Sequence, residues 1–298
     1  MNRQQTQKTR RLQKNLFIAA IFAVPVFNFL LLNIGSLFNM VTLAFQGYNI
    51  EKGYYWNNFA NFKDIMTDLM NPLLWTGFKN SVLFYVIGLV MLLVSLVISY
   101  YIFKGHPGSN FFKILFIMPG IVTGMVWVTL FKYFVQRAVP VLFGLDYGWL
   151  TTLETTMPTL IGFGVWLGFA GNLIIFVGTM SGISDELVEA GQLDGTNAFT
   201  EFYHIVIPHT FPIVQVNLVA GVIGLFLSGP PLYDFFGLTA HESLYSIDYF
   251  LKVKVLQGGS GPAQYAYTAA FSILLTLIVA PGTFFMRWAT TKFGPSED

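Results

Sequence analysis

The sequence predicts an all-α, polytopic membrane protein with six transmembrane helices. Hydrophobic residues make up 54% of the 298-residue chain, charged residues make up 10%, and the mean hydropathy is +0.61. These values lie outside the usual range of soluble domains. Six apolar stretches approach the length of about 20 residues that a helix needs to cross a bilayer. They are Leu16–Phe38, Val82–Phe103, Ile114–Phe131, Pro158–Met180, Phe211–Leu227 and Tyr267–Trp288, and Arg287 is the one charged residue they contain.

A basic segment precedes the first stretch and predicts its orientation. Five cations lie there, namely Arg3, Lys8, Arg10, Arg11 and Lys14. The segment resembles the n-region of a signal peptide, but the apolar run after it is long and lacks a convincing cleavage site, so we expect a retained helix. Basic residues beside a first helix favour the cytoplasm, and six crossings then predict an N-in, C-in topology. The expected parts are a cytoplasmic tail (1–15), a transmembrane domain (16–288) and a second cytoplasmic tail (289–298).

The later stretches contain residues that favour packing of one helix against another. The spaced pairs Gly120 and Gly124, Gly164 and Gly168, and Gly221 and Gly224 allow helix backbones to approach closely. Pro119 is expected to kink the third stretch or end its first part. The amides within the stretches, at Asn28, Asn33, Asn172, Gln215 and Asn217, more often bridge helices than bind cargo.

The loop between the fourth and fifth stretches, residues 181–210, is the most unusual segment, and we name it the acidic loop. It holds five acids and no Lys or Arg, although the predicted topology places it in the cytoplasm, where basic residues are favoured. Ser184 is expected to cap a short helix whose first turn carries Asp185 and Glu186. Asp194-Gly195 is a strong turn signal after that helix. An acidic helix at a membrane surface indicates a protein partner.

A second helical segment is expected after the turn in the acidic loop. Thr196 is a candidate cap, and Pro208 is expected to end the segment before the fifth stretch. Phe199, Phe202, Tyr203 and Val206 follow helical spacing and predict one apolar, aromatic face. Small residues at 190 and 191 would let the first helix enter a groove on a partner.

No motif for an energy source or for catalysis of its own appears in the chain. It has no Gly-x4-Gly-Lys-Ser/Thr phosphate loop, no His-Glu-x-x-His and no Gly-x-Ser-x-Gly. Its histidines, at 106, 204, 209 and 241, show no metal-ligand spacing, and it has no cysteine. No carboxylate lies within the apolar stretches, as an ion-coupled carrier would typically need. We therefore predict no catalytic residue, no metal site and no cofactor in this chain, and no nucleic-acid partner.

One spaced pattern within the acidic loop carries a family resemblance. Glu189-Ala-Gly-Gln-Leu-Asp-Gly195 is followed, after nine residues, by Ile205-Val-Ile-Pro208. This resembles the signature of permease subunits in binding-protein-dependent ABC importers, Glu-Ala-Ala, three residues, Gly, nine residues, Ile-x-Leu-Pro. Gly191 replaces the second Ala, and Ile207 replaces Leu. Asp194-Gly195, the run from Gly168 to Phe176 and the run from Tyr265 to Ser272 resemble carbohydrate-importing members of the first, maltose-type permease class, whereas Tyr233 to Gly261 has no recognisable counterpart.

The resemblance implies an ABC type I importer permease fold with a cytoplasmic coupling helix, in a multi-pass subunit of a bacterial cytoplasmic membrane. The implied partners are a second homologous permease, two ABC ATPase subunits that bind ATP and Mg, and an extracytoplasmic binding protein that delivers a sugar or oligosaccharide. The implied coupling residues are Glu189, Ala190, Gly191, Asp194, Gly195, Phe199, Phe202, Tyr203 and Pro208. Nucleotide binding in the ATPases would then bias which side of the bundle opens.

Aromatic faces and amides that could line a path for a sugar lie on the fourth and fifth stretches. The candidates are Trp166, Leu167, Gly168, Gly171, Asn172, Asn217, Gly224 and Ser228. Two other functions stay open from the sequence. The chain could belong to an importer of another solute, such as glycerol phosphate or a polyamine, or it could be a non-transporting scaffold that recruits a cytoplasmic protein through the acidic loop.

Overall fold

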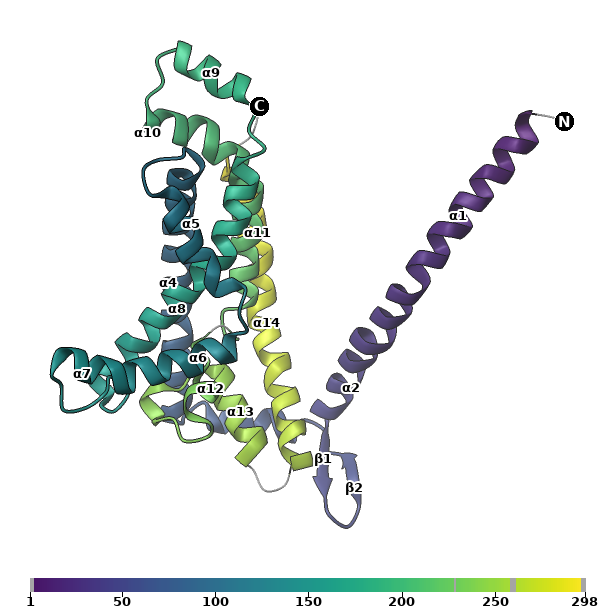
Figure 1. Cartoon of the computed structure of the whole chain (residues 1–298). Helices are drawn as coiled ribbons and strands as arrows, with labels where there is room; N and C mark the ends of the chain where they lie inside the picture. The colour runs from purple at the N-terminus through teal and green to yellow at the C-terminus, as the bar shows by residue number, and fades with distance from the viewer. Residues whose placement is uncertain (1–2, 228, 258–260, 296–298) are drawn as a thin grey trace. The chain divides into compact units, whose positions relative to one another are not determined.

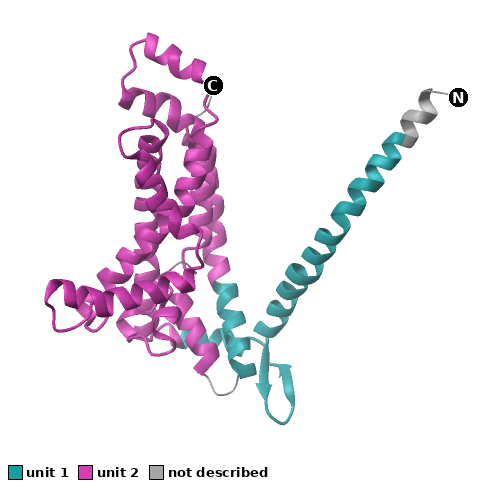
Figure 2. Ribbon diagram, in the orientation of Figure 1, with its two compact units in different colours: residues 1–67, 258–274 teal, residues 68–257, 275–298 magenta. Residues whose placement is uncertain are grey.

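The computed structural model describes residues 3–227, 229–257 and 261–295, with side chains from Arg10 onward. Within these ranges the chain is mainly helical and has one β-hairpin. It divides into two compact units, residues 1–67 with 258–274 and residues 68–257 with 275–298 (Figure 2).

Unit 1 begins with a long, unbroken helical run. The α-helix α1 (Arg3–Asn28), the π-helical turn η1 (Phe29–Ile34) and the α-helix α2 (Gly35–Ala44) follow one another directly. The segment from Arg10 to Ala44 is long and apolar enough to cross a membrane, and 0% of its most apolar window is buried. Its exposed apolar side chains therefore suit a lipid environment, and the predicted first crossing Leu16–Phe38 lies inside it.

A small hairpin and all but the last residue of a helix follow α2 in the same unit. Strands β1 (Gln46–Asn49) and β2 (Gly53–Trp56) pair antiparallel, and Gly53 adopts a φ of +69° beside the turn. Helix α3 (Ala60–Asp68) comes next, and its Asn61 Nδ2 donates hydrogen bonds to the carbonyl oxygens of Ala44 (2.9 Å) and Gln46 (2.8 Å). The Asn61 amide thereby satisfies a carbonyl group at the end of α2 that has no partner within the helix.

Three long helices form the centre of unit 2. They are α4 (Pro72–Phe103), α8 (Leu153–Met180) and α11 (Ile207–Ile223), and they run side by side (Figure 1). Helix α4 begins where the Asn71 side chain accepts a hydrogen bond of 2.9 Å from the Leu73 N–H, with Pro72 in the first turn. One buried cluster joins the three helices at one end, namely Leu92, Leu96, Tyr100, Phe176, Met180, Ile183, Val206 and Val214.

The third apolar stretch, Ile114–Phe131, is interrupted at Pro119. It contains the end of α5 (Ser109–Ile117) and most of α6 (Gly124–Tyr133) with the 3₁₀ turn η2 (Met118–Gly120) between them, and the helix then continues as the π-helical turn η3 (Phe134–Ala138) and α7 (Val139–Phe143). Pro119 cannot continue the helical hydrogen bonding, so the expected break there is confirmed. The candidate span is Gly124–Phe143, and α6 runs across the direction of α4 and α8 (Figure 1). This candidate span extends beyond the predicted stretch and includes Lys132 and Arg137, which lie outside Ile114–Phe131.

The remaining elements lie at the two ends of unit 2 or continue into α14. They are α9 (Asp185–Leu193), α10 (Ala198–Glu201), the π-helical turn η4 (Phe202–Val206), α12 (Leu232–Phe236), the 3₁₀ turn η5 (Glu242–Leu244), α13 (Ile247–Gln257) and α14 (Gly261–Phe293). Helices α9 and α10 lie at one end of unit 2, and α12 and α13 lie at the opposite end (Figure 1). Within the described residues, six helical runs are long and apolar enough to cross a membrane, which agrees with the predicted number.

Candidate functional site

Helix α9 of the acidic loop is defined by local hydrogen bonds at both ends. The Ser184 hydroxyl accepts a hydrogen bond of 3.4 Å from the Leu187 N–H, so the predicted cap is confirmed. The helix ends in a Schellman motif, in which Gly195 N–H donates to Gln192 O and Thr196 N–H donates to Gly191 O, both at 3.0 Å. Gly195 has a φ of +82°, which explains why a glycine occupies this position.

Helix α9 presents an acidic face to the surroundings and packs through its other face. Asp185, Glu186, Glu189 and Asp194 are all exposed. On the packed face, Val188 lies against the buried cluster of α4, α8 and α11, and Gly191 is half-buried. Since Ala190 and Gly195 are also exposed, a partner could reach the backbone beside the acidic side chains.

The second segment of the acidic loop begins one residue later than predicted. Asn197, and not Thr196, caps α10, because its Oδ1 accepts hydrogen bonds from the Thr200 N–H (2.9 Å) and hydroxyl (3.0 Å). The Thr196 N–H is already hydrogen-bonded in the Schellman motif. Asn197 is the next residue, and its extended backbone, at φ −90° and ψ 171°, suits an N-terminal cap. The Thr196 hydroxyl is buried and has no hydrogen-bond partner among the described residues.

The four residues of the predicted aromatic face do not share one environment, because two of them are packed and two are exposed. Phe202 contacts the Tyr100 ring at 5.0 Å between centroids and Val206 is 1% exposed, whereas Phe199 and Tyr203 are 77% and 59% exposed. The prediction that Pro208 ends the segment is also wrong, since α10, η4 and α11 continue without a break. Pro208 lies in the first turn of α11, directly after the π-helical turn η4, where a local change of hydrogen bonding accommodates its missing N–H.

Glu201 is a residue of the acidic loop whose role the sequence did not reveal. It is 4% exposed, and its carboxylate accepts hydrogen bonds from Lys104 Nζ at 2.9 Å and 3.1 Å. Lys104 follows α4 directly, 97 residues before Glu201, so no local pattern could pair the two. Four of the five acids of the acidic loop are therefore exposed, and the fifth is held inside unit 2.

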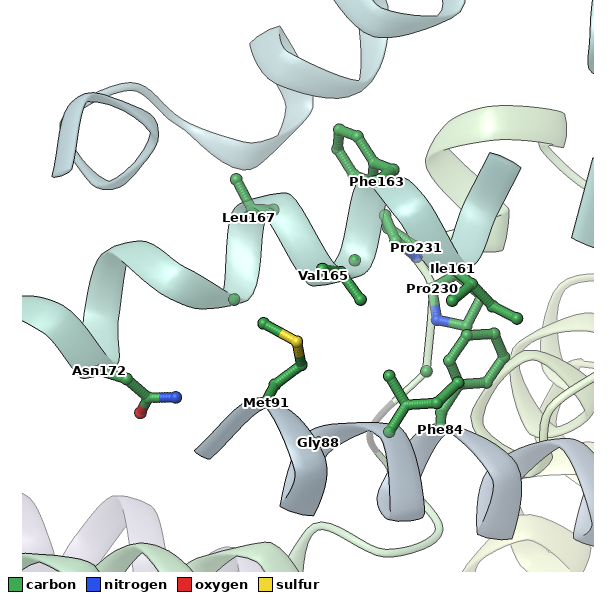
Figure 3. A pocket seen from close by; sticks show the side chains of 14 residues that line it. Phe84, Gly88, Met91, Ile161, Phe163, Val165, Leu167, Asn172, Pro230 and Pro231 are labelled. Atoms are coloured by element: carbon green, nitrogen blue, oxygen red, sulfur yellow. The ribbon is translucent and has the colours of Figure 1, made fainter. Parts of the chain in front are cut away.

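A cavity of about 390 Å³ lies between α4 and α8 (Figure 3). Phe84, Ile87, Gly88 and Met91 of α4 line one side. Helix α8 lines the other side, with Ile161, Phe163, Gly164, Val165, Leu167, Gly168 and Asn172, while Gly229, Pro230 and Pro231 complete the lining. A β-carbon added at Gly88, Gly164 or Gly168 would meet no atom within 4 Å. These glycines therefore leave space open, while Gly120 and Gly221 pack closely, a β-carbon there meeting Ala170 at 3.1 Å and Tyr85 at 3.4 Å.

The structure brings part of the predicted sugar path to this cavity. Leu167, Gly168 and Asn172 line it, and the Asn172 amide points into the space (Figure 3). Asn217 instead donates to Ile213 O of its own helix at 3.0 Å, and Trp166 packs edge-on against Trp127 at 4.8 Å between centroids. Gly171 and Gly224 lie outside the lining, and Ser228 lies outside the described residues. The contribution of α4 could not be read from the sequence, because it depends on which face of α4 meets α8.

Comparison with protein families places the chain in a class of transport proteins. The family described as "Binding-protein-dependent transport system inner membrane component" matches residues 106–296. The chain belongs to this family, and it is an inner-membrane transport component. The family resemblance noted in the sequence is thereby confirmed, and so is the membrane location.

Curated relatives and solved structures agree with this assignment. The chain is similar to the probable ABC transporter permease protein YesP of Bacillus subtilis (strain 168), with 26% identity over 237 residues and 76% of each protein covered. It is also similar to the maltose/maltodextrin transport system permease protein MalF of Escherichia coli (strain K12), with 24% identity over 253 residues, covering 78% of this chain and 48% of MalF. A structure of a bacterial ABC transporter involved in the import of the acidic polysaccharide alginate matches with a TM-score of 0.68 and 17% identity, covering 95% of this chain and 99% of that chain. This structural likeness supports the fold, which is that of an importer permease.

Proposed function

We propose that this chain is a permease subunit of an ATP-driven ABC importer, and that it translocates a sugar or oligosaccharide delivered by an extracytoplasmic binding protein. In this proposal a second homologous permease completes the pathway across the membrane. Two partner ATPase subunits bind ATP and Mg and hydrolyse the nucleotide. This chain contributes no nucleotide site, and its sequence has no phosphate-loop motif.

The observation that carries the proposal is the construction of α9. Its acidic face is exposed, and its packed face rests on the buried cluster that joins α4, α8 and α11. A partner bound to α9 therefore acts on the core of unit 2. The signature-like spacing from Glu189 to Pro208 supports an ATPase as that partner, and so does membership of the binding-protein-dependent transport family.

The proposed topology has both chain ends in the cytoplasm, with tails over 1–15 and 289–298 and a membrane domain over 16–288 between them. The basic residues before the first apolar stretch support this orientation. The acidic loop then faces the ATPases. The segment around α12 and α13, at the opposite end of unit 2, faces the binding protein.

A neutral sugar is the proposed cargo. The curated relative MalF is named for maltose and maltodextrin transport, and the described lining of the cavity combines apolar and aromatic side chains with the Asn172 amide. Sugar sites combine aromatic faces with a few placed hydrogen-bonding groups. The structural relative is involved in import of the acidic polysaccharide alginate, and an acidic cargo would favour cationic groups in the lining, which the described residues of this cavity lack.

Reconstitution of the transporter tests the proposal. The chain is co-expressed with its candidate permease, ATPase and binding-protein partners, purified as a complex, and placed in proteoliposomes. ATP hydrolysis is measured with the binding protein alone and with the binding protein loaded with a maltodextrin, and uptake of the labelled sugar is measured in parallel. We expect the loaded binding protein to stimulate hydrolysis and uptake together. A complex that assembles yet shows neither sugar-dependent hydrolysis nor uptake with neutral sugars contradicts the proposed cargo, and failure of the chain to assemble with any ATPase contradicts the proposed function itself.

A further inference from the structure

The acidic loop is joined to the end of α4 by polar contacts that lie apart from the exposed acidic face of α9. The Lys104 and Glu201 side chains are 22% and 5% exposed, and Nζ contacts both carboxylate oxygens, at 2.9 Å and 3.1 Å. One turn earlier on α4, the Tyr100 hydroxyl donates to Ala198 O at 3.1 Å, and its ring packs against Phe202. Two consecutive turns of the α4 end therefore hold α10 and η4.

The opposite end of α4 is joined to the segment that contains η5 and α13. Asn80 Nδ2 donates to Ser243 O at 2.9 Å and to Tyr245 O at 2.8 Å. The hydroxyl of Ser81, which is fully buried, accepts a hydrogen bond of 3.0 Å from the Ile247 N–H. Between the two ends, α4 lines the cavity with Phe84, Gly88 and Met91.

Helix α4 is continuous over its 32 residues from Pro72 to Phe103, with its proline confined to the first turn. A helix without an interior proline or a π-helical turn moves largely as one piece. We therefore expect a displacement of its Lys104 end to displace the cavity wall and the partners of Asn80 and Ser81 as well.

We propose that Lys104 and Glu201 are positioning residues that fix the acidic loop to α4, so that α4 transmits the position of α9 to the cavity and to the η5–α13 segment. This inference rests on the proposed function, since it names the element through which a docked ATPase acts. Stability alone does not explain the pair, because apolar residues of similar volume often stabilise a buried site as well as an ion pair does. Unlike apolar packing, an ion pair specifies one relative position of α4 and α10, because the Lys104 ammonium group must meet the carboxylate at a single place on α10.

The absence of native cysteine allows a direct test in this chain. Val97 of α4 and Leu193 of α9 are 56% and 89% exposed, so Val97→Cys with Leu193→Cys accepts two spin labels without disturbing packed residues. The distance distribution between the labels is measured by double electron–electron resonance on the full chain in lipid nanodiscs. The backgrounds are the unaltered pair, Lys104→Met, Glu201→Gln, and the exchange of Lys104→Glu with Glu201→Lys.

We expect a narrow distribution with the unaltered pair, a width about twofold larger in each single variant, and a return toward the narrow form when the charges are exchanged. The matched control is Lys252→Met, which breaks an exposed pair with Asp248 at 2.8 Å within one helix. Its distribution should stay narrow. The proposal is overturned if the distance distribution in the single variants is as narrow as in the unaltered chain. It is also overturned if the width of the distribution increases in proportion to the loss of thermal stability in every variant, including the control.

A second measurement uses the assembled complex and separates this proposal from the proposed function. In proteoliposomes, the amount of sugar imported per ATP hydrolysed should fall in Lys104→Met and recover when the charges are exchanged. A merely structural role would lower the amount of assembled complex and leave this ratio unchanged. If the unaltered complex shows no sugar-dependent hydrolysis, the proposed function fails, while the distance measurement still decides whether Lys104 and Glu201 position α9.

Discussion

Gly191 of α9 lies directly against Ile205 of η4. A β-carbon at position 191 would come within 3.0 Å of Ile205 Cδ1 and 3.2 Å of Thr196 Oγ1. Helix α9 can approach η4 this closely because position 191 has no side chain. Position 191, where the family signature has its second Ala, is therefore a tight contact that favours a small residue in this chain.

The effect of a replacement at Gly191 on stability should depend on the size of the new side chain. In Gly191→Ala the end of the Ile205 side chain can shift by the few tenths of an ångström required, so we expect a small effect on stability. Gly191→Val adds volume that α9 can accommodate only by moving away from η4, which should destabilise the local structure by about 1–3 kcal/mol. Protection of the α9 amides from hydrogen exchange measures the effect. Equal protection in the Ala and Val variants would show that the contact with Ile205 does not set the position of α9.

Replacement of Gly195 should act through the backbone alone. A β-carbon there would meet no atom within 4 Å, but the φ of +82° disfavours residues other than glycine. Gly195→Ala should cost about 1–2 kcal/mol and reduce sugar-dependent ATP hydrolysis, while Gly195→Asn should have a smaller effect because Asn tolerates this conformation. Gly178→Ala is the matched control, since that glycine is also sterically free but lies within α8. Normal hydrolysis in a folded Gly195→Ala complex would contradict the importance of this turn.

The two amides of the predicted sugar path should behave differently. Asn172 lines the cavity, whereas Asn217 is hydrogen-bonded within its own helix at 3.0 Å. Loss of one hydrogen bond to a sugar lowers affinity by about 3- to 10-fold, so Asn172→Ala should raise the sugar concentration needed for half-maximal uptake by that factor. Asn217→Ala should leave that concentration unchanged. A larger effect of Asn217→Ala would place the path elsewhere.

Filling the cavity should impair uptake without impairing assembly. Gly168 faces open space between α4 and α8, so Gly168→Val can be accommodated sterically while it occupies volume that a cargo would need. We expect reduced uptake with normal recovery of the complex. Gly178→Val adds the same side chain to the same helix at an exposed position outside the lining and serves as the control. Unchanged uptake in Gly168→Val would exclude the cavity from the transport path.

The contacts at the Asn80 end of α4 predict a local change in protection. In Ser81→Ala the buried Ile247 N–H loses its acceptor, which should cost about 1–3 kcal/mol. Hydrogen exchange should then increase over η5 and the first turn of α13. Thr76→Ala is the control, because the Thr76 hydroxyl bonds only to Pro72 O of its own helix, at 3.1 Å, among the described residues. A uniform increase in exchange over the whole chain would indicate general destabilisation instead.

The features predicted correctly from sequence are those decided by neighbours along the chain. Composition and the length of the apolar stretches indicated a membrane protein with six crossings, because burial in lipid requires long apolar helices. Ser184, Asp194 and Gly195 indicated both ends of α9, because caps and turns depend on hydrogen bonds between residues three to five positions apart. The spacing from Glu189 to Pro208 identified the family for the same reason, since a linear motif is complete within the sequence.

Tertiary structure decided the features that depend on how one helix is rotated against another. Composition alone could not show that Glu201 is withdrawn from the acidic face by Lys104, nor that Gly164 and Gly168 border a cavity while Gly120 packs against Ala170. Pro208 was predicted to end a helix, yet the π-helical turn before it lets the helix continue into α11. The sequence by itself determined the class of protein, the number of apolar helices and the two ends of α9. Packing determined which residues meet, because contacts between distant segments depend on helix rotation, which no local pattern specifies.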